Sequence, residues 1–326
     1  MTKRIIEIGP DELATLQGRA LLESIRSASG RAVAAEIVAF RPPLIDGVSN
    51  AGLAAALGVD IVHLNHYDVN NPQIAGFPSH PEGIKAWGKI GFMVEPTGEI
   101  EDAVCGFLGT MGLGVTIHEL RAAIGRVVGV SLEVVFDQTT APPGRQAIPE
   151  TAARAIQQGT AYITLVATPA HSPDTLAANL RTLRAGLDPD VVLVAGRMPW
   201  GGSREGVPEF LDAAEVEKQV TAGADMVMIP APGTMPGATF EAITQAVAAA
   251  HYLGALAEIT IGTSQESADE ETVRRLAMDS RLTGADIYQI GDGGYGGMAI
   301  PENILAFATA IKGKRHTYRR TASTRT

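Results

Sequence analysis

Four stretches of the chain share one order of residues, in which a helical pattern ends at a glycine and an apolar run of strand length follows almost at once. Glycine readily adopts the left-handed conformation that ends many helices, so each stretch predicts a junction from helix to strand. This repeat is the main organising signal of the sequence. The four stretches are 56–64, 158–165, 222–229 and 283–290.

Eight apolar runs predict strands, and segments with helical periodicity lie between them. The expected strands are Val33–Phe40, Asp60–Asn65, Val127–Phe136, Tyr162–Ala167, Val191–Ala195, Met226–Pro230, Leu256–Ile261 and Ile287–Ile290. Regular alternation of strands and helices requires a parallel sheet, because each helix returns the chain to the same edge. Eight such units predict an α/β fold closed into a (β/α)8 TIM barrel, rather than an open doubly wound sheet.

Three segments fall outside this alternation. Residues 1–31 predict an N-terminal helical extension, with an amphipathic helix over roughly Pro10–Ala28 that covers the bottom of the barrel. Residues 67–125 are too long for an ordinary connection after the second strand, so we expect an active-site cover followed by the second helix, which ends near 118–124. The barrel domain then spans 32–312, and the basic tail 313–326 is expected to be frayed or to lie in a subunit contact.

Composition narrows the class of partner. The 326 residues exceed the roughly 250 of a typical barrel, which leaves room for the extension and the insertion without a second domain. Hydrophobic residues make up 45% of the chain and charged residues 19%, enough for a large core. The net charge of −10 argues against nucleic acid, whose phosphates are bound by basic surfaces. We therefore expect a small-molecule substrate and no nucleic-acid partner.

Cysteine content and apolar runs bear on the compartment. Cys105 is the only cysteine, which excludes an intramolecular disulfide and suits a reducing cytoplasm. The first residues contain no long apolar run of the kind found in a signal peptide or a membrane span. The expectation is a cytoplasmic homo-oligomer with no membrane partner.

Polar residues at the carboxyl ends of the strands are the candidates for chemistry, because the loops after the strands build the active site of such barrels. His63 and Asn65 share one face of a strand, and His66 follows in the loop. The catalytic candidates are His63, His66, Glu133 and Arg197, and Asp46 and Asn65 are expected to contact substrate. His66 or Glu133 would serve as the acid or base, with Arg197 and His63 as electrophiles.

A glycine-rich segment follows the last strand. Gly291–Met298 contains five glycines and precedes a helix that begins near Pro301. Exposed backbone N–H groups and a positive helix terminus can bind an anion, and the last two loops of barrels commonly hold a phosphate. The candidate phosphate-binding residues are Thr263, Ser264, Asp292, Gly293, Gly294 and Tyr295. The alternative is a flexible lid or a tight backbone turn.

A divalent metal such as Mg²⁺ is a candidate cofactor. Carboxylates at Glu36, Asp68 and Glu258 are its expected ligands, although their spacing matches no diagnostic metal motif. The alternative is that the carboxylates inside the barrel pair with Arg197 or orient a catalytic group. No lysine falls on an expected strand and no Gly-x-Ser-x-Gly or P-loop motif occurs, which argues against Schiff-base, serine-hydrolase and nucleotide-hydrolase chemistry.

Two segments resemble known families. Pro43–Leu64 resembles the first βαβ unit of the phosphoenolpyruvate mutase and isocitrate lyase superfamily, and the ending Gly-Asp-x-Gly-Tyr-x-Gly-Met at Gly291–Met298 is similar to an uncharacterised family of bacterial TIM barrels. The superfamily resemblance implies Mg²⁺-assisted chemistry on the enolate of a 2-oxo acid, with cleavage of a C–C or C–P bond. The chain departs from that pattern, because the expected paired aspartates are missing and Asp68 and Asp137 stand alone.

Three functions are consistent with these features. The first is a lyase or mutase that acts through an enolate-like intermediate on a phosphorylated or carboxylated metabolite. The second is a metal-independent phosphosugar isomerase or epimerase, in which Glu133 and either Asp137 or His63 form a two-base pair. The third is a non-catalytic ligand-binding barrel. Loss of activity with EDTA would favour the first over the second.

Overall fold

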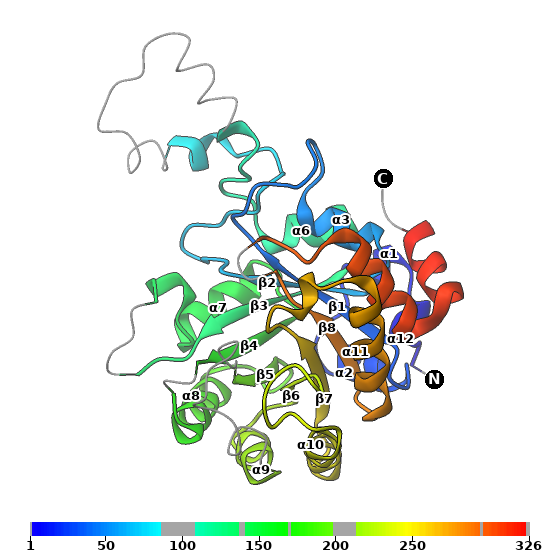
Figure 1. Ribbon diagram of the computed structural model, residues 1–326. Helices are drawn as coiled ribbons and strands as arrows, with labels where there is room; N and C mark the ends of the chain where they lie inside the picture. Colours follow the sequence, from blue (N-terminus) through cyan, green and yellow to red (C-terminus); the bar gives the residue numbers. More distant parts are fainter. Residues whose placement is uncertain are drawn as a thin grey trace.

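The computed structural model describes residues 2–85, 108–136, 141–168, 171–197, 213–293 and 296–323. Within these residues, eight parallel strands pair in chain order, and the last pairs with the first to close a barrel (Figure 1). The strands are β1 Ala32–Val38, β2 Ile61–Asn65, β3 Val127–Glu133, β4 Tyr162–Ala167, β5 Val192–Arg197, β6 Met226–Pro230, β7 Leu256–Ile261 and β8 Ile287–Ile290. The predicted TIM barrel is confirmed.

Strand ends differ from the predictions by up to three residues. The strand expected over Val127–Phe136 ends at Glu133, that over Val33–Phe40 ends at Val38, and that over Val191–Ala195 runs on to Arg197. Apolar side chains such as Val134 continue the buried pattern past the end of a strand because they pack over the barrel edge. A hydrophobic run therefore marks burial more closely than it marks the ladder of hydrogen bonds.

In the described part of the chain, a helix packs outside the barrel between each pair of strands, and another follows β8 (Figure 1). These helices are α3 Asn50–Ala56, α6 Ile117–Ile124, α7 Pro149–Gln157, α8 Pro173–Gly186, α9 Ala213–Thr221, α10 Phe240–Tyr252, α11 Glu270–Leu282 and α12 Pro301–Ala322. Several begin at a side chain that accepts a backbone N–H of the first turn, as Ser49, Thr116 and Asp269 do. α6 is the second helix expected at the end of the 67–125 insertion.

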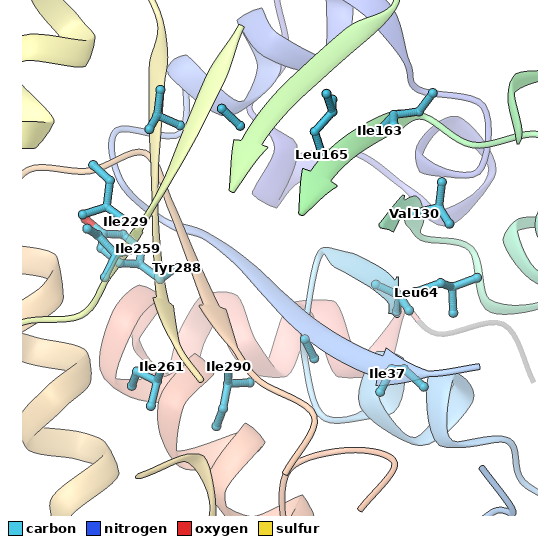
Figure 2. Packing of buried hydrophobic residues seen from close by; sticks show 14 of the residues in the cluster. Ile37, Leu64, Val130, Ile163, Leu165, Ile229, Ile259, Ile261, Tyr288 and Ile290 are labelled. Atoms are coloured by element: carbon cyan, nitrogen blue, oxygen red, sulfur yellow. The ribbon is translucent and has the colours of Figure 1, made fainter. Parts of the chain in front are cut away.

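Side chains alternate between the helices and the lumen along each strand. The outward ones form a continuous apolar core against the helices, and Figure 2 shows ten of them labelled, including Ile37, Leu64 and Ile259. A second apolar cluster fills the lower lumen with inward residues such as Ile61, Val194 and Met226. These two cores hold the barrel rigid beneath its carboxyl rim.

The N-terminal extension closes the bottom of the barrel, as predicted. Ile5, Leu13 and Ile25 pack in the same cluster as the lower lumen residues. The expected single helix over Pro10–Ala28 is wrong, because it is two helices, α1 Pro10–Leu13 and α2 Gly18–Arg26, after a 3-10 turn η1 at Ile5–Glu7. The break falls at Gly18, whose φ of +62° interrupts a continuous helix.

The repeated Gly-x-Asp sequence has a structural explanation. The carboxylates of Asp60, Asp225 and Asp286, each just before a strand, accept the backbone N–H of Val33, Leu193 and Ala257 on the preceding strand. Each also binds a basic side chain: Asp60 binds Lys312 and Arg320, Asp225 binds Arg19 and Arg184, and Asp286 contacts His251. Each aspartate therefore joins two neighbouring strands and a helix at the bottom of the barrel.

The C-terminal segment corrects another expectation. Residues 313–322 are not frayed, because α12 continues to Ala322 after a break in helical geometry at Gly313. Lys312 Nζ lies 2.6 Å from Asp60, and the guanidinium of Arg320 also binds that carboxylate. Both cations are buried, so their ion pairs with Asp60 anchor the end of α12 to the barrel. They are not part of a solvent-exposed tail.

Some predictions lie outside the described residues. They concern Cys105, Asp137, Gly294, Tyr295 and the part of the expected cover at 86–107. In the described part of the chain, no helix combines the length and apolar character needed to cross a membrane.

Candidate functional site

The upper lumen is polar, which is unusual for a layer that branched apolar side chains commonly fill. On β1, Val33, Ala35 and Ile37 belong to the outer core, so Glu36 faces inward. The same alternation on the other strands gives a set of buried inward polar residues: Glu36, His63, Ser131, Tyr162, Thr164, Glu258, Thr260 and Gln289. This set lies at the carboxyl side of the apolar plug, where barrel enzymes bind their substrates.

His63 is held by two hydroxyl groups at the base of this polar layer. Its Nδ1 lies 3.0 Å from the hydroxyl of Tyr162, and its Nε2 lies 2.7 Å from Oγ of Ser131. A Cβ at Gly129 would lie 2.1 Å from the ring of Tyr162, so only glycine leaves room for that ring in the lumen. Burial lowers the pKa of His63 to about 4, so the imidazole is neutral at physiological pH.

Two carboxyl groups share the lumen with this trio. Burial, followed by the charges of Asp292, Glu258 and Glu266, raises the pKa of Glu36 well above its usual range. Burial also raises the pKa of Glu258 to about 7. Burial and then the nearby charges of Glu258 and Glu36 raise the pKa of Tyr162 as well, which places all three groups in one electrostatic neighbourhood. A carboxyl group that titrates near neutrality is typical of acid–base sites.

Several of these lumen groups have polar atoms that no described residue satisfies. They are Oγ1 of Thr164, Oε1 of Glu258, Oγ1 of Thr260, and both amide atoms of Gln289, whose side chain is 0% exposed. Buried polar groups in native proteins are nearly always hydrogen-bonded, so each of these atoms requires a partner from water or ligand. The unsatisfied atoms mark positions in the lumen where water or a bound molecule could supply the missing hydrogen bonds.

The loops after β2 and β8 meet above the lumen. Asn65 donates to Oδ2 of Asp292 at 3.1 Å, and the backbone N–H of Asp292 donates to Glu36. His66 follows with a φ of +59°, a strained value for a residue other than glycine, and its N–H donates to Oδ1 of Asn65. The structure therefore brings together Glu36, Asn65, His66 and Asp292.

A pocket of about 390 Å³ opens beside this rim. Its walls come from the segments after β1, β2 and β3, and they include Phe40, His66, Asp68 and Arg145. The ring of Phe40 meets that of His66 edge to face, with centroids 6.0 Å apart. His66 therefore lies between this pocket and the lumen residues.

Two other catalytic candidates are engaged in ion pairs. Glu133 accepts hydrogen bonds from the guanidinium of Arg145, and Arg197 lies 3.0 Å from Glu215 on α9. Arg197 shares the outward alternation of Leu193 and Ala195, so its side chain runs toward the helix and not toward His63. The structure does not bring Arg197 together with His63 and Asp292.

The remaining candidates lie in the loops. Asp46 is exposed at the tip of the turn between β1 and α3. Thr263 donates to the backbone oxygen of Thr234 at 2.9 Å, and Ser264 and Gly293 both have positive φ. Phosphate binding by Thr263, Ser264, Asp292 and Gly293 stays a prediction, and carboxylates at Glu36 and Glu266 lie near Asp292.

Of the three expected metal ligands, Glu36 and Glu258 share the lumen and Asp68 lies in the loop after β2. Oδ1 of Asp68 accepts the backbone N–H groups of Asn70 and Asn71 and so stabilises its own loop. Among the described residues, no three His, Cys, Asp or Glu side chains are grouped so that they could hold a metal ion. Within this part of the chain Glu36, Asp68 and Glu258 form no such group, and a Mg²⁺ cofactor stays a prediction.

Sequence reasoning missed Ser131, Tyr162, Thr260 and Gln289. Each occupies an inward position on an expected strand. The alternation of the strands could have identified them, because polar side chains at inward positions stand out against the apolar ones.

Comparison with known proteins identifies the family. The chain matches, over residues 6–326, the family described as a domain of unknown function, DUF7916, and it belongs to that family. No curated protein matches it. Among solved structures, it is similar to a protein from Burkholderia cenocepacia J2315 described as a "putative lyase/mutase", with 18% identity and a TM-score of 0.42 over 83% of this chain and 80% of that one.

Proposed function

We propose that this member of the DUF7916 family is an enzyme that moves a proton at a carbon next to a carbonyl group, through an enolate-like intermediate. Its overall reaction would be that of a lyase or mutase on a carboxylated or phosphorylated metabolite. One observation carries the proposal: Glu258 stands inside the barrel near a second carboxyl group, Glu36, with an oxygen that no described residue satisfies.

Glu258 is the proposed acid and base. Its carboxylate form would take a proton from the substrate carbon, which leaves the enolate, and its acid form would return a proton to carbon. Because burial raises the pKa of Glu258 to about 7, both forms are available at neutral pH. The hydroxyl and amide groups that share the lumen with Glu258 are uncharged, and such fixed dipoles can stabilise charge that develops during the reaction.

Neutral donors would stabilise the enolate oxygen. Gln289 and Thr260 occupy neighbouring positions on the paired strands β8 and β7, and the amide and the hydroxyl both lie on the inner face of the barrel. The hydroxyls of Ser131 and Tyr162 bind the two ring nitrogens of His63, which fixes both hydroxyl groups in place. In this proposal His63 is a positioning residue, because both of its ring nitrogens already have partners.

The test is solvent deuterium exchange. The protein would be incubated in D₂O with a panel of 2-oxo acids (pyruvate, 2-oxobutyrate and 2-oxoglutarate), and the C3 proton signals followed by NMR. We expect exchange in at least one acid that Glu258→Gln abolishes and Glu271→Gln, an exposed change on α11, leaves intact. Exchange that survives Glu258→Gln would remove Glu258 from the reaction.

A metal-independent isomerase or epimerase is the second candidate. Two buried carboxyl groups, Glu36 and Glu258, can act as a two-base pair, and the described part of the chain groups no three metal-binding side chains. Exchange in a phosphosugar such as ribulose 5-phosphate that is indifferent to EDTA would favour this reaction. Exchange in a 2-oxo acid that EDTA abolishes would favour the lyase or mutase with a metal.

A further inference from the structure

Three adjacent strands line one side of the lumen with hydrogen-bond acceptors. Gln289 on β8 is level with Thr260 on β7 and with Ala34 on β1. Glu36 lies two residues after Ala34 on β1, and Glu258 lies two residues before Thr260 on β7. Side chains two residues apart share one face of a strand, so the four polar side chains form one patch. The patch consists of Glu36, Glu258, Thr260 and Gln289.

The patch has two carboxyl groups and no cation of its own. It contains two carboxyl groups, and the charges of Glu266 and Asp292 act on Glu36 from the mouth of the barrel. No lysine or arginine occupies an inward position on the described strands, and Arg145 and Arg197 at the rim are paired with Glu133 and Glu215. Burial without a cation disfavours the ionised form of both carboxyl groups, and a positively charged occupant would stabilise that form by pairing with it.

The unsatisfied atoms specify the kind of cation. Oε1 of Glu258, Oγ1 of Thr260 and Oε1 of Gln289 have no partner among the described residues, and their side chains are all more than nine-tenths buried. Three acceptors on one side match the three N–H donors of a primary ammonium group. A divalent metal fits less well, because the described His, Cys, Asp and Glu side chains form no group of three with suitable geometry.

We infer that the inner faces of β7, β8 and β1 form a binding site for a primary ammonium group, which holds the amino end of the substrate. That the bound molecule is the substrate rests on the proposed function. It narrows the substrate class to metabolites that carry an amino group in addition to the group that is activated. The binding site itself can be tested without turnover.

The test measures the melting temperature and the Kd of small probes on the full chain. Ethanolamine hydrochloride is the probe, compared at equal ionic strength with potassium chloride, magnesium chloride and sodium glycolate, and with ethylene glycol as the neutral analogue. We expect ethanolamine to raise the melting temperature most. The Kd for ethanolamine should rise at least about tenfold in Glu258→Gln, a loss of about 1.4 kcal/mol.

Two further variants separate recognition from folding. Thr260→Val keeps the shape of the side chain and removes one acceptor, so it should also weaken ethanolamine binding. Glu271→Gln removes an exposed carboxylate of α11 and should leave the Kd unchanged. Circular dichroism would establish that each variant is folded before its Kd is compared.

The outcomes are distinct. Binding of ethanolamine that depends on Glu258 and Thr260 supports the site. No effect of ethanolamine, an equal effect of ethylene glycol, or a larger Glu258-dependent effect of potassium or magnesium overturns it. Ammonium binding without deuterium exchange in any carbonyl substrate would support this site and contradict the proposed reaction. Deuterium exchange without ammonium binding would support the proposed reaction and contradict this site.

Discussion

The hydroxyl of Tyr162 lies 3.0 Å from Nδ1 of His63, and the two rings stack with centroids 5.7 Å apart. Both side chains are buried, so this contact separates the polar upper lumen from the apolar plug beneath it. It also leaves His63 with a partner on each ring nitrogen, since Ser131 occupies the other. The contact therefore organises the floor of the proposed site.

Removing this hydroxyl should change both stability and the state of His63. In Tyr162→Phe, Nδ1 of His63 loses its partner in a buried site, which we expect to lower the free energy of unfolding by about 1–3 kcal/mol. Urea denaturation measures that loss, and ¹⁵N NMR of the imidazole reports the tautomer. Tyr67→Phe is the control, because it breaks a bond to Gln158 away from His63. Unchanged His63 resonances in Tyr162→Phe would contradict the assigned contact.

The room for Tyr162 depends on one glycine. A Cβ at Gly129 would come within 2.1 Å of the Tyr162 ring, so Gly129→Ala should displace the ring and cost about 1–3 kcal/mol of stability. Gly196→Ala, also on a barrel strand, places its Cβ no closer than 3.3 Å to Thr164 and should cost less than about 1 kcal/mol. Urea denaturation of both variants checks the difference, and equal costs would show that the ring does not occupy this space.

The fold could be predicted from sequence because its signals are local. Each glycine junction, as at Gly223 and Gly284, ends a helix and starts a strand within a few residues, and all eight predicted strands exist. The end of α12 could not be predicted in this way. Arg320 is buried only because Asp60, 260 residues away in the chain, receives its guanidinium. Basic composition alone could not distinguish that long-range pair from a solvated tail.

The buried ion pairs of Asp60 with Lys312 and Arg320, here called the Asp60 cluster, should be a major source of stability. Burial raises the pKa of Asp60, but the charges of Lys312 and Arg320 outweigh it and hold the pKa below its ordinary value. Asp60→Asn would leave two buried cations without their carboxylate, so we expect a loss of about 3–5 kcal/mol in urea denaturation. Asp174→Asn, which removes an exposed pair with Lys218, should change stability by less than about 1 kcal/mol. Similar losses in the two variants would contradict the account of the cluster.

Glu258 should make stability depend on pH. Its pKa rises from an ordinary 4.5 to about 7 on burial, so the folded protein binds more protons than the unfolded chain between these values. The stabilising contribution is complete below pH 4.5 and is lost as pH rises through 7, a change of about 3 kcal/mol. Denaturation of the wild type and Glu258→Gln from pH 4.5 to 8 measures it. If the difference in free energy of unfolding between the two proteins stays constant with pH, the pKa of Glu258 lies near its ordinary value.

The candidate site was only partly predictable. Asn65 could be identified because it ends a strand, where barrel chemistry occurs, and His63 and Glu258 because they are polar residues within expected strands. The ion pair of Arg197 with Glu215 could not, because it depends on where α9 packs against β5. Nor could the neutral state of His63, which follows from its burial between Tyr162 and Ser131. Such properties arise from packing in three dimensions and leave no local mark in the sequence.

The most direct test of the central claim, that proton transfer occurs inside the barrel at Glu258, is the rate of deuterium exchange into a reactive carbonyl substrate as a function of pH. We expect the wild-type rate to follow an ionisation near pH 7 and to fall by at least about a hundredfold in Glu258→Gln, with Glu271→Gln unchanged. A rate that keeps the same pH profile and magnitude in Glu258→Gln would contradict the claim.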